Sequence, residues 1–148
     1  MILNYESYGS GREVVIVLHE WLGDHRNYQQ IMAYLDGDTY QWLFVDLRGY
    51  GLSKDISGAY TCDESSLDLI ALADNLQIES FHLVGHSMTG LIAMNTACEF
   101  PDRILSLTLL TPVPPSGIQV PEATRHDLEM ITTDVSLMEQ AIQARTAN

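Results

Sequence analysis

Basic residues are scarce in this chain. Its 148 residues include seven Lys and Arg against 20 Asp and Glu, which gives a formal net charge of −13 at pH 7. Nucleic-acid binding depends on neutralising phosphates with Lys and Arg, which seven scattered cations cannot do well. We therefore expect no nucleic-acid partner. The same negative field would also repel an anionic substrate at long range.

Cysteine and long apolar runs are also scarce. The two cysteines, Cys62 and Cys98, match neither a disulfide framework nor a zinc site. No stretch approaches the roughly 18–20 apolar residues of a membrane helix. The opening residues, MILNYESYG, lack the basic start and apolar core of a secretory signal. We expect no metal, no cofactor and no membrane contact, and a location in the reducing cytoplasm.

Apolar runs of strand length are present, and they alternate with helical patterns. VVIVLH at 14–19 is rich in β-branched residues, which is typical of a strand buried on both faces. Thr61 and Glu64 have the spacing of a helix capping box. Strands separated by helices form parallel sheets, so we predict an α/β fold with a mainly parallel sheet and flanking helices. The expected strands are 2–8, 14–19, 42–47, 81–85 and 104–110, and the expected helices are 24–35, Thr61 to Leu76, and 87–100.

The pattern changes after Thr111. The segment PVPPSG has three prolines in four residues, so it cannot continue a strand and reads as a stiff linker. Short helices with modest apolar faces are expected at 121–131 and 134–145, and they resemble a lid. The predicted domains are a core region at 1–112 and a linker with lid helices at 113–148.

One serine stands between an apolar strand and a helix, in GHSMTG at 85–90. A strand that turns abruptly into a helix presents a serine at the tip of the turn, beside backbone N–H groups that can stabilise an oxyanion. The G-x-S-x-G pattern is met at Gly85 and Ser87, but residue 89 is Thr. Two interpretations follow from these residues alone. Ser87 is a nucleophile, or it caps the helix that follows.

Four segments together resemble the α/β-hydrolase superfamily, in the order that this family has them. They are VVIVLHEW, DLRGYGLS, GHSMTG and FPDRILSLTLL. The resemblance extends from the first residues to about 112, with the start of a lid insertion after that, as in lid-bearing serine hydrolases. It implies an α/β-hydrolase core truncated after the fourth core strand, with short lid helices.

The resemblance also implies roles for particular residues. Ser87 would be the nucleophile, and the N–H groups of Trp21 and Met88 would form the oxyanion hole. Glu20 stands where the family usually has Gly, so we expect its carboxylate to point away from the hole or to bond to its own loop. Arg48, in DLRGYGLS, is expected to brace the loop below the site rather than to contact substrate.

The acid and the base of a triad are missing from the expected places. In this fold they follow the nucleophile in the order Asp or Glu, then His. Only His126 follows Ser87, and its polar surroundings indicate a surface residue. We therefore interpret the chain as an N-terminal fragment. Its last strand, Ile104–Leu110, would be an exposed apolar edge, for which we predict self-association.

The resulting prediction is a serine hydrolase that cleaves ester, acyl or carbon–carbon bonds of a small substrate, present without its triad acid and base. Two alternatives stay open. One is a cofactor-free dioxygenase on the same fold, which HEW followed by DHRNY faintly resembles and which relies on a His–Asp pair. The other is a non-catalytic fragment that acts as a binding or assembly module.

Overall fold

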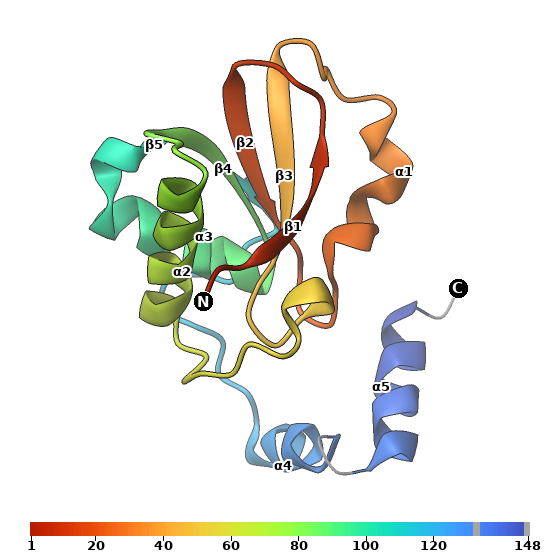
Figure 1. Ribbon diagram of the computed structural model, residues 1–148. Helices are drawn as coiled ribbons and strands as arrows, with labels where there is room; N and C mark the ends of the chain where they lie inside the picture. Colours follow the sequence, from red (N-terminus) through yellow and green to blue (C-terminus); the bar gives the residue numbers. More distant parts are fainter. Residues whose placement is uncertain (132–133, 147–148) are drawn as a thin grey trace. The chain divides into compact units, whose positions relative to one another are not determined.

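The computed structural model describes residues 1–131 and 134–146. It divides into two units, Met1–Ser116 and Gly117–Asn148. The first unit contains a sheet with helices on both faces, and the second contains two helices (Figure 1). The predicted boundary after residue 112 falls in the linker just before this division.

Five strands form one sheet in the order β1-β3-β2-β4-β5 (Figure 1). β1 runs antiparallel to β3, and all other neighbours are parallel. The predicted α/β class with a mainly parallel sheet is confirmed. The strands are β1 (Asn4–Tyr8), β2 (Glu13–Leu18), β3 (Tyr40–Asp46), β4 (Phe81–His86) and β5 (Ile104–Leu110).

Two helices, α2 (Cys62–Asn75) and α3 (Met88–Glu99), cover one face of the sheet (Figure 1). The Thr61 hydroxyl accepts a hydrogen bond from the Glu64 N–H at 3.2 Å, which confirms the predicted start of α2. Apolar side chains at helical spacing on α2 and α3 meet buried strand residues and form the larger core. Its members include Ile16, Leu18, Leu43, Val45, Leu69, Leu72, Ala73, Phe81, Leu83, Ile92 and Ala93.

The other face is covered by η1 (His25–Tyr28) and α1 (Gln29–Met32). The predicted helix at 24–35 is therefore wrong in its extent, and Tyr34, expected on its apolar side, is 87% exposed. The chain turns early because Asp36 Oδ1 accepts hydrogen bonds from the N–H groups of Asp38 and Thr39, both at 3.0 Å. Only Tyr28, Met32 and Leu35 reach the smaller core, where they pack with Val15, Val17 and Phe44.

β5 lies at one end of the sheet, and among the described residues it pairs only with β4. Two of its apolar side chains, Leu105 and Leu110, are 55% and 42% exposed. Two short 3-10 turns complete the first unit, η2 (Gly51–Ser53) and η3 (Pro101–Arg103).

The second unit contains α4 (Glu122–Ile131) and α5 (Val135–Thr146). Both helices lie close to the predicted ranges of 121–131 and 134–145. Within 1–131 and 134–146, no helix combines the length and the apolar character needed to cross a bilayer.

Candidate active site

Ser87 joins β4 to α3 in a backbone conformation that side chains rarely adopt, with φ 55° and ψ −115°. For a residue other than glycine, such a conformation costs about 1–3 kcal/mol, and it persists only where several contacts of the surrounding structure hold it in place. The Ser87 side chain makes no capping hydrogen bond to α3. Ser87 thus occupies the N-cap position of α3 without capping it through its side chain, and its positive-φ backbone at a strand-to-helix turn is the geometry expected of a nucleophile elbow.

The strained turn is tied to the end of β5. The Ser87 N–H donates to the Leu110 carbonyl, and the Val113 N–H donates to the Ser87 carbonyl, both at 2.9 Å. The Ser87 carbonyl also accepts from the Gly90 N–H at 3.1 Å. The conformation of Ser87 therefore depends on residues more than 20 positions away in the sequence.

Small residues around Ser87 let the strand, the turn and the helix approach closely. A Cβ on Gly85 would lie 2.7 Å from Ala93 Cβ, and one on Gly90 would lie 2.6 Å from Pro112 Cβ. Thr89, at the place of the expected glycine, is fully buried. Its hydroxyl accepts from the N–H of His86 at 2.9 Å and donates to the carbonyl of the same residue at 3.0 Å. The departure from G-x-S-x-G thus adds two hydrogen bonds to the turn.

The loop after β2 is fixed by His19, which is completely buried. Its Nε2 accepts from the Leu47 N–H at 3.2 Å, so its proton is on Nδ1, which donates to the Glu20 carbonyl at 2.8 Å. Burial lowers the pKa of His19, which keeps the ring neutral. The Gly23 N–H donates to the same carbonyl at 3.1 Å, which closes a turn around Trp21.

Trp21 and Met88, the predicted oxyanion donors, follow two neighbouring strands. β2 and β4 pair in parallel, with Val17 opposite Val84, so both strands end at the same edge of the sheet. The strand order reverses between β2 and β4, and open α/β sheets bind ligands at such a reversal. The two loops therefore follow neighbouring strands at the same edge of the sheet, and the roles of the two N–H groups stay predictions.

The Glu20 carboxylate contacts side chains outside its own loop, those of Asn27 in η1 and His86 at the end of β4. Asn27 Nδ2 donates to Glu20 Oε1 at 3.4 Å, and Glu20 Oε2 lies 3.7 Å from His86 Nε2. On the other side of the imidazole, the Tyr28 hydroxyl lies 3.4 Å from His86 Nδ1 and donates to the Leu18 carbonyl at 2.9 Å. Burial, together with the charge of Glu20, raises the pKa of Tyr28 to about 12.

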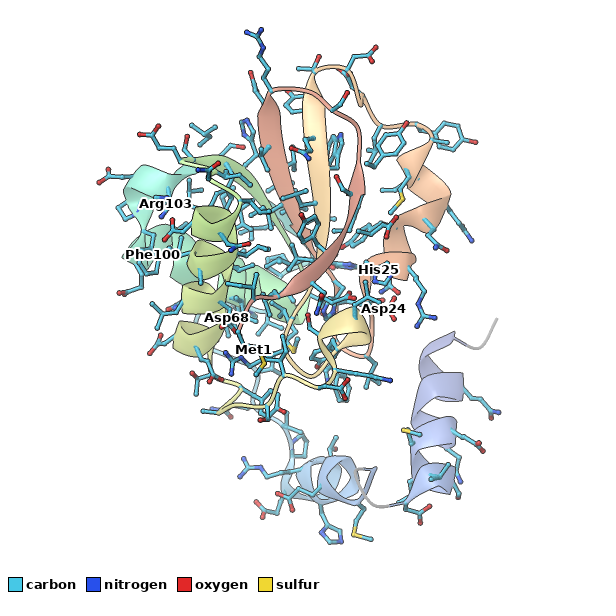
Figure 2. All side chains as sticks on the ribbon, viewed as in Figure 1. Met1, Asp24, His25, Asp68, Phe100 and Arg103 are labelled. Carbon is cyan, nitrogen blue, oxygen red and sulfur yellow. The ribbon has the colours of Figure 1, made fainter. Side chains whose placement is uncertain are left out.

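Asp46 and Arg48 brace the floor of the site. Fully buried Asp46 accepts from the N–H and the Nδ1 of His25, both at 2.7 Å, and from the Leu52 N–H at 2.8 Å. Arg48 pairs with Asp68 and Glu64 through contacts of 2.6–2.7 Å, which confirms the bracing interpretation. Figure 2 shows His25 and Asp24 beside each other at this end of the sheet. Sequence reasoning missed the His25–Asp46 pair.

A cavity of about 350 Å³ lies beside Met88. Its wall is mainly aromatic and apolar, and it contains one buried hydroxyl, that of Ser65. The volume falls within the range of about 300–1,000 Å³ that is usual for small-molecule sites. The lining residues are Leu47, Arg48, Gly49, Tyr50, Tyr60, Ser65, Met88 and Ile92.

No histidine among the described residues bonds to the Ser87 hydroxyl. The rings of His19, His25 and His82 have partners elsewhere, and that of His86 faces Glu20 and Tyr28. His126 is exposed and belongs to the second unit. Within 1–131 and 134–146, no group of His, Cys, Asp and Glu could hold a metal ion.

Known proteins match this arrangement. A family model described as alpha/beta hydrolase fold matches residues 13–142. Over 102 residues the chain is 36% identical to 3-oxoadipate enol-lactonase 2 of Acinetobacter baylyi, covering 68% of this chain and 38% of the relative. It is also 30% identical to a 2-hydroxy-6-oxononadienedioate/2-hydroxy-6-oxononatrienedioate hydrolase of Burkholderia vietnamiensis, in a match that covers 99% of this chain and 59% of the relative.

A solved structure agrees with the sequence matches. The meta-cleavage product hydrolase CumD superposes with a TM-score of 0.67 and 28% identity, over 75% of this chain and 42% of that chain. The chain thus spans 38% to 59% of the length of these three proteins. The strained serine turn, the parallel sheet and the family model agree, and the chain belongs to the alpha/beta hydrolase fold family.

Proposed function

We propose that this chain carries the nucleophile of a serine hydrolase, and that Ser87 attacks the carbonyl carbon of an ester, another acyl compound or a substrate cleaved at a carbon–carbon bond. The observation that supports this most is the strained backbone of Ser87, which two hydrogen bonds hold to the end of β5 and the start of the linker. A structural serine gains nothing from such strain. The names of the relatives, a lactonase and two hydrolases, agree with hydrolytic chemistry.

The proposed reaction has two steps. Ser87 Oγ forms a bond to the carbonyl carbon, and its proton passes to a base. The developing oxyanion accepts hydrogen bonds from the Trp21 and Met88 N–H groups, and the leaving group departs with a proton. Water then cleaves the acyl-serine and restores the hydroxyl. Each oxyanion donor contributes about 10²–10³ in rate in enzymes of this kind.

Within Met1–Ser116 no histidine bonds to the Ser87 hydroxyl, so the proposal does not take its base from this unit. We propose that a further segment or another chain supplies the base. Without acid and base, a serine site retains only about 10³–10⁴-fold acceleration over water. We therefore expect slow acylation of Ser87 in this chain.

The cavity beside Met88 supports a small neutral substrate with an aromatic or apolar part. Its cation, Arg48, already pairs with Glu64 and Asp68, so it is not available to a substrate carboxylate. The net charge of −13 also disfavours anions. The dicarboxylates named for the Burkholderia relative are thus not the substrates that we propose here.

An alkyl fluorophosphonate, which reacts with activated serines, tests the proposal. Tryptic peptide 55–103 contains Ser87 and should gain one phosphonyl group, located at Ser87 by fragmentation. Ser87→Ala should abolish this adduct. Ser57 is an exposed serine of the same peptide, and Ser57→Ala should leave the adduct on Ser87 unchanged. An unlabelled Ser87 in folded protein, or equal labelling of Ser57, would contradict the proposal.

A cofactor-free dioxygenase is the second candidate, and the His25–Asp46 pair favours it. The fully buried carboxylate orients the imidazole, whose side chain is 12% exposed beside a surface cleft that also contains Lys54. Such an enzyme would deprotonate a hydroxylated nitrogen heterocycle and consume oxygen. Oxygen uptake that survives Ser87→Ala but is lost in His25→Gln would favour this candidate over the hydrolase.

The third candidate is a binding or assembly module, for which we propose self-association of two chains through β5. The strand is paired on one side only within the described residues, and Leu105 and Leu110 are exposed on it. Unpaired strand edges invite pairing with another chain. Light scattering at increasing concentration should show dimers, and Leu105→Lys should shift the chain to monomer. A monomer at all concentrations contradicts this candidate.

We also propose a cytoplasmic location. Cys62 and Cys98 are both free thiols, and Cys98 is exposed. Exposed free thiols persist in reducing compartments. Fractionation of expressing cells should place the protein with cytoplasmic markers, and recovery with secreted proteins would contradict this.

A further inference from the structure

A second serine–histidine–acid arrangement lies on the sheet, away from Ser87. His82 Nδ1 lies 2.7 Å from Ser106 Oγ, and His82 Nε2 lies 3.2 Å from Glu13 Oε2. Both distances are within the range of hydrogen bonds. The three side chains come from three neighbouring strands, β2, β4 and β5.

The strand register produces this arrangement. His82 is directly opposite Ser106 on one side and Val15 on the other. Glu13 precedes Val15 by two residues, so it points to the same face of the sheet. Tyr40 meets the His82 ring edge-on, with centroids 6.0 Å apart and an interplanar angle of 81°, and limits the orientations of the imidazole.

The hydrogen-bond directions are those of a general base. A carboxylate only accepts, so the bond to Glu13 requires a proton on His82 Nε2. In the neutral ring Nδ1 is then the acceptor, and the Ser106 hydroxyl donates to it. An acid that orients a histidine, which in turn accepts from a serine, is the arrangement that activates serine nucleophiles.

The arrangement is open to solvent. Ser106 is exposed, and the side chains of His82 and Glu13 are 24% and 54% exposed. Ser106 lies within β5, next to a register shift, and not at a turn before a helix. It therefore has no counterpart of the elbow that presents N–H groups to an oxyanion, and turnover is not expected.

We propose that Ser106 is a second nucleophilic serine, activated by His82 and Glu13, that takes up one equivalent of a reactive acyl or phosphonyl group. With an alkyl fluorophosphonate, Ser106 Oγ forms a bond to phosphorus and the P–F bond breaks. Fluoride leaves, and the serine proton passes to His82 Nδ1 and then to water. The product is a stable phosphonyl-serine and one equivalent of HF.

Trypsin separates the two serines, because Ser106 lies in peptide 104–125 and Ser87 in peptide 55–103. The full chain is treated with the alkyl fluorophosphonate, and adducts on the two peptides are located by fragmentation. The expected result is labelling of Ser106 that persists in Ser87→Ala and disappears in Ser106→Ala. His82→Gln should slow this labelling at least about tenfold, since positioned bases contribute about 10²–10⁴.

Thr108→Ala is the matched control, since Thr108 is exposed on the same strand and the same face, two residues beyond Ser106. It should leave labelling of Ser106 unchanged. An unmodified Ser106 in folded protein would overturn the proposal, as would labelling that His82→Gln does not slow. Because each serine is mapped on its own peptide, failure at Ser106 is separate from failure at Ser87.

Discussion

Ser87 follows the end of β4, Ser106 lies within the neighbouring strand β5, and each has what the other lacks. Ser87 has a strained backbone at the start of a helix, but no histidine partner among the described residues. Ser106 has a histidine that also contacts a carboxylate, but it lies within β5 and not at a turn before a helix. A serine nucleophile needs a backbone turn that presents it and side chains that activate it, and a fold can place these two features at different serines.

The two features also depend on different parts of the structure. The Ser87 turn rests on backbone hydrogen bonds to Leu110 and Val113 and on the close packing of Gly90 against Pro112. The Ser106 cluster rests on strand register and lies at the surface. Substitutions near Ser87 should therefore cost stability as well as reactivity, whereas those near Ser106 should affect reactivity alone.

Asp46→Ala should have the largest effect. It leaves three donors from His25 and Leu52 without their buried acceptor. Removing one partner of a buried, hydrogen-bonded pair lowers the free energy of unfolding by about 3–5 kcal/mol. Urea unfolding followed by circular dichroism measures this loss, with the exposed Asp55→Ala as the control. A loss equal to that of the control would mean that Asp46 does not brace the floor.

Gly90→Ala should come next. The new Cβ would meet Pro112 Cβ at 2.6 Å and Pro112 Cα at 2.9 Å, so the linker must shift. Overpacking of this kind costs about 1–3 kcal/mol. The shift should also lower fluorophosphonate labelling of Ser87 and leave that of Ser106 unchanged. Labelling of Ser87 equal to that in the parent chain would show that the linker does not hold the Ser87 turn.

Tyr28→Phe should have a smaller effect, which diminishes at alkaline pH. At neutral pH it removes the hydrogen bond to the Leu18 carbonyl, which contributes about 1 kcal/mol. Burial raises the pKa of Tyr28 from 10.0 to about 12, so the folded state disfavours the ionised form. The resulting stability is complete below pH 10 and is lost as the pH rises towards 12.

The phenylalanine variant should therefore lose less stability than the parent chain between pH 10 and 12. Thermal unfolding at a series of alkaline pH values measures this. Parallel decline of the two proteins across this window would show that Tyr28 ionises as freely when folded as when unfolded.

His82→Gln should have the smallest effect on stability, within about 0.5 kcal/mol, because its bonds to Ser106 and Glu13 lie at the surface. Urea unfolding checks this. A loss of several kcal/mol would show that the cluster is a structural element, and the contrast between the two serines would disappear.

The strands and the elbow were predictable because their signals are local. Runs of β-branched and apolar residues mark strands such as β2, and the start of α2 at Thr61 has a capping pattern. The place of Ser87 between a strand and a helix was visible for the same reason. Its conformation was not, because it depends on Leu110 and Val113 through backbone hydrogen bonds.

The missed features are contacts between residues far apart in the sequence. His25 meets Asp46 across 21 positions, and His82 meets Ser106 across 24 and Glu13 across 69. Hydrophobic periodicity carries no information on such pairs. The only signal for the surface cluster is the presence of polar residues inside three otherwise apolar strands, and strand order is needed to bring them together.

The most direct test of Ser87 as the nucleophile is the rate of nitrophenolate release from p-nitrophenyl acetate. It is measured for Ser106→Ala and for the double variant that also carries Ser87→Ala, so that the second serine cannot contribute. The account predicts slow release by Ser106→Ala, with acetyl-Ser87 detectable by mass, and release at the solvent rate by the double variant. Equal rates for the two proteins would contradict it.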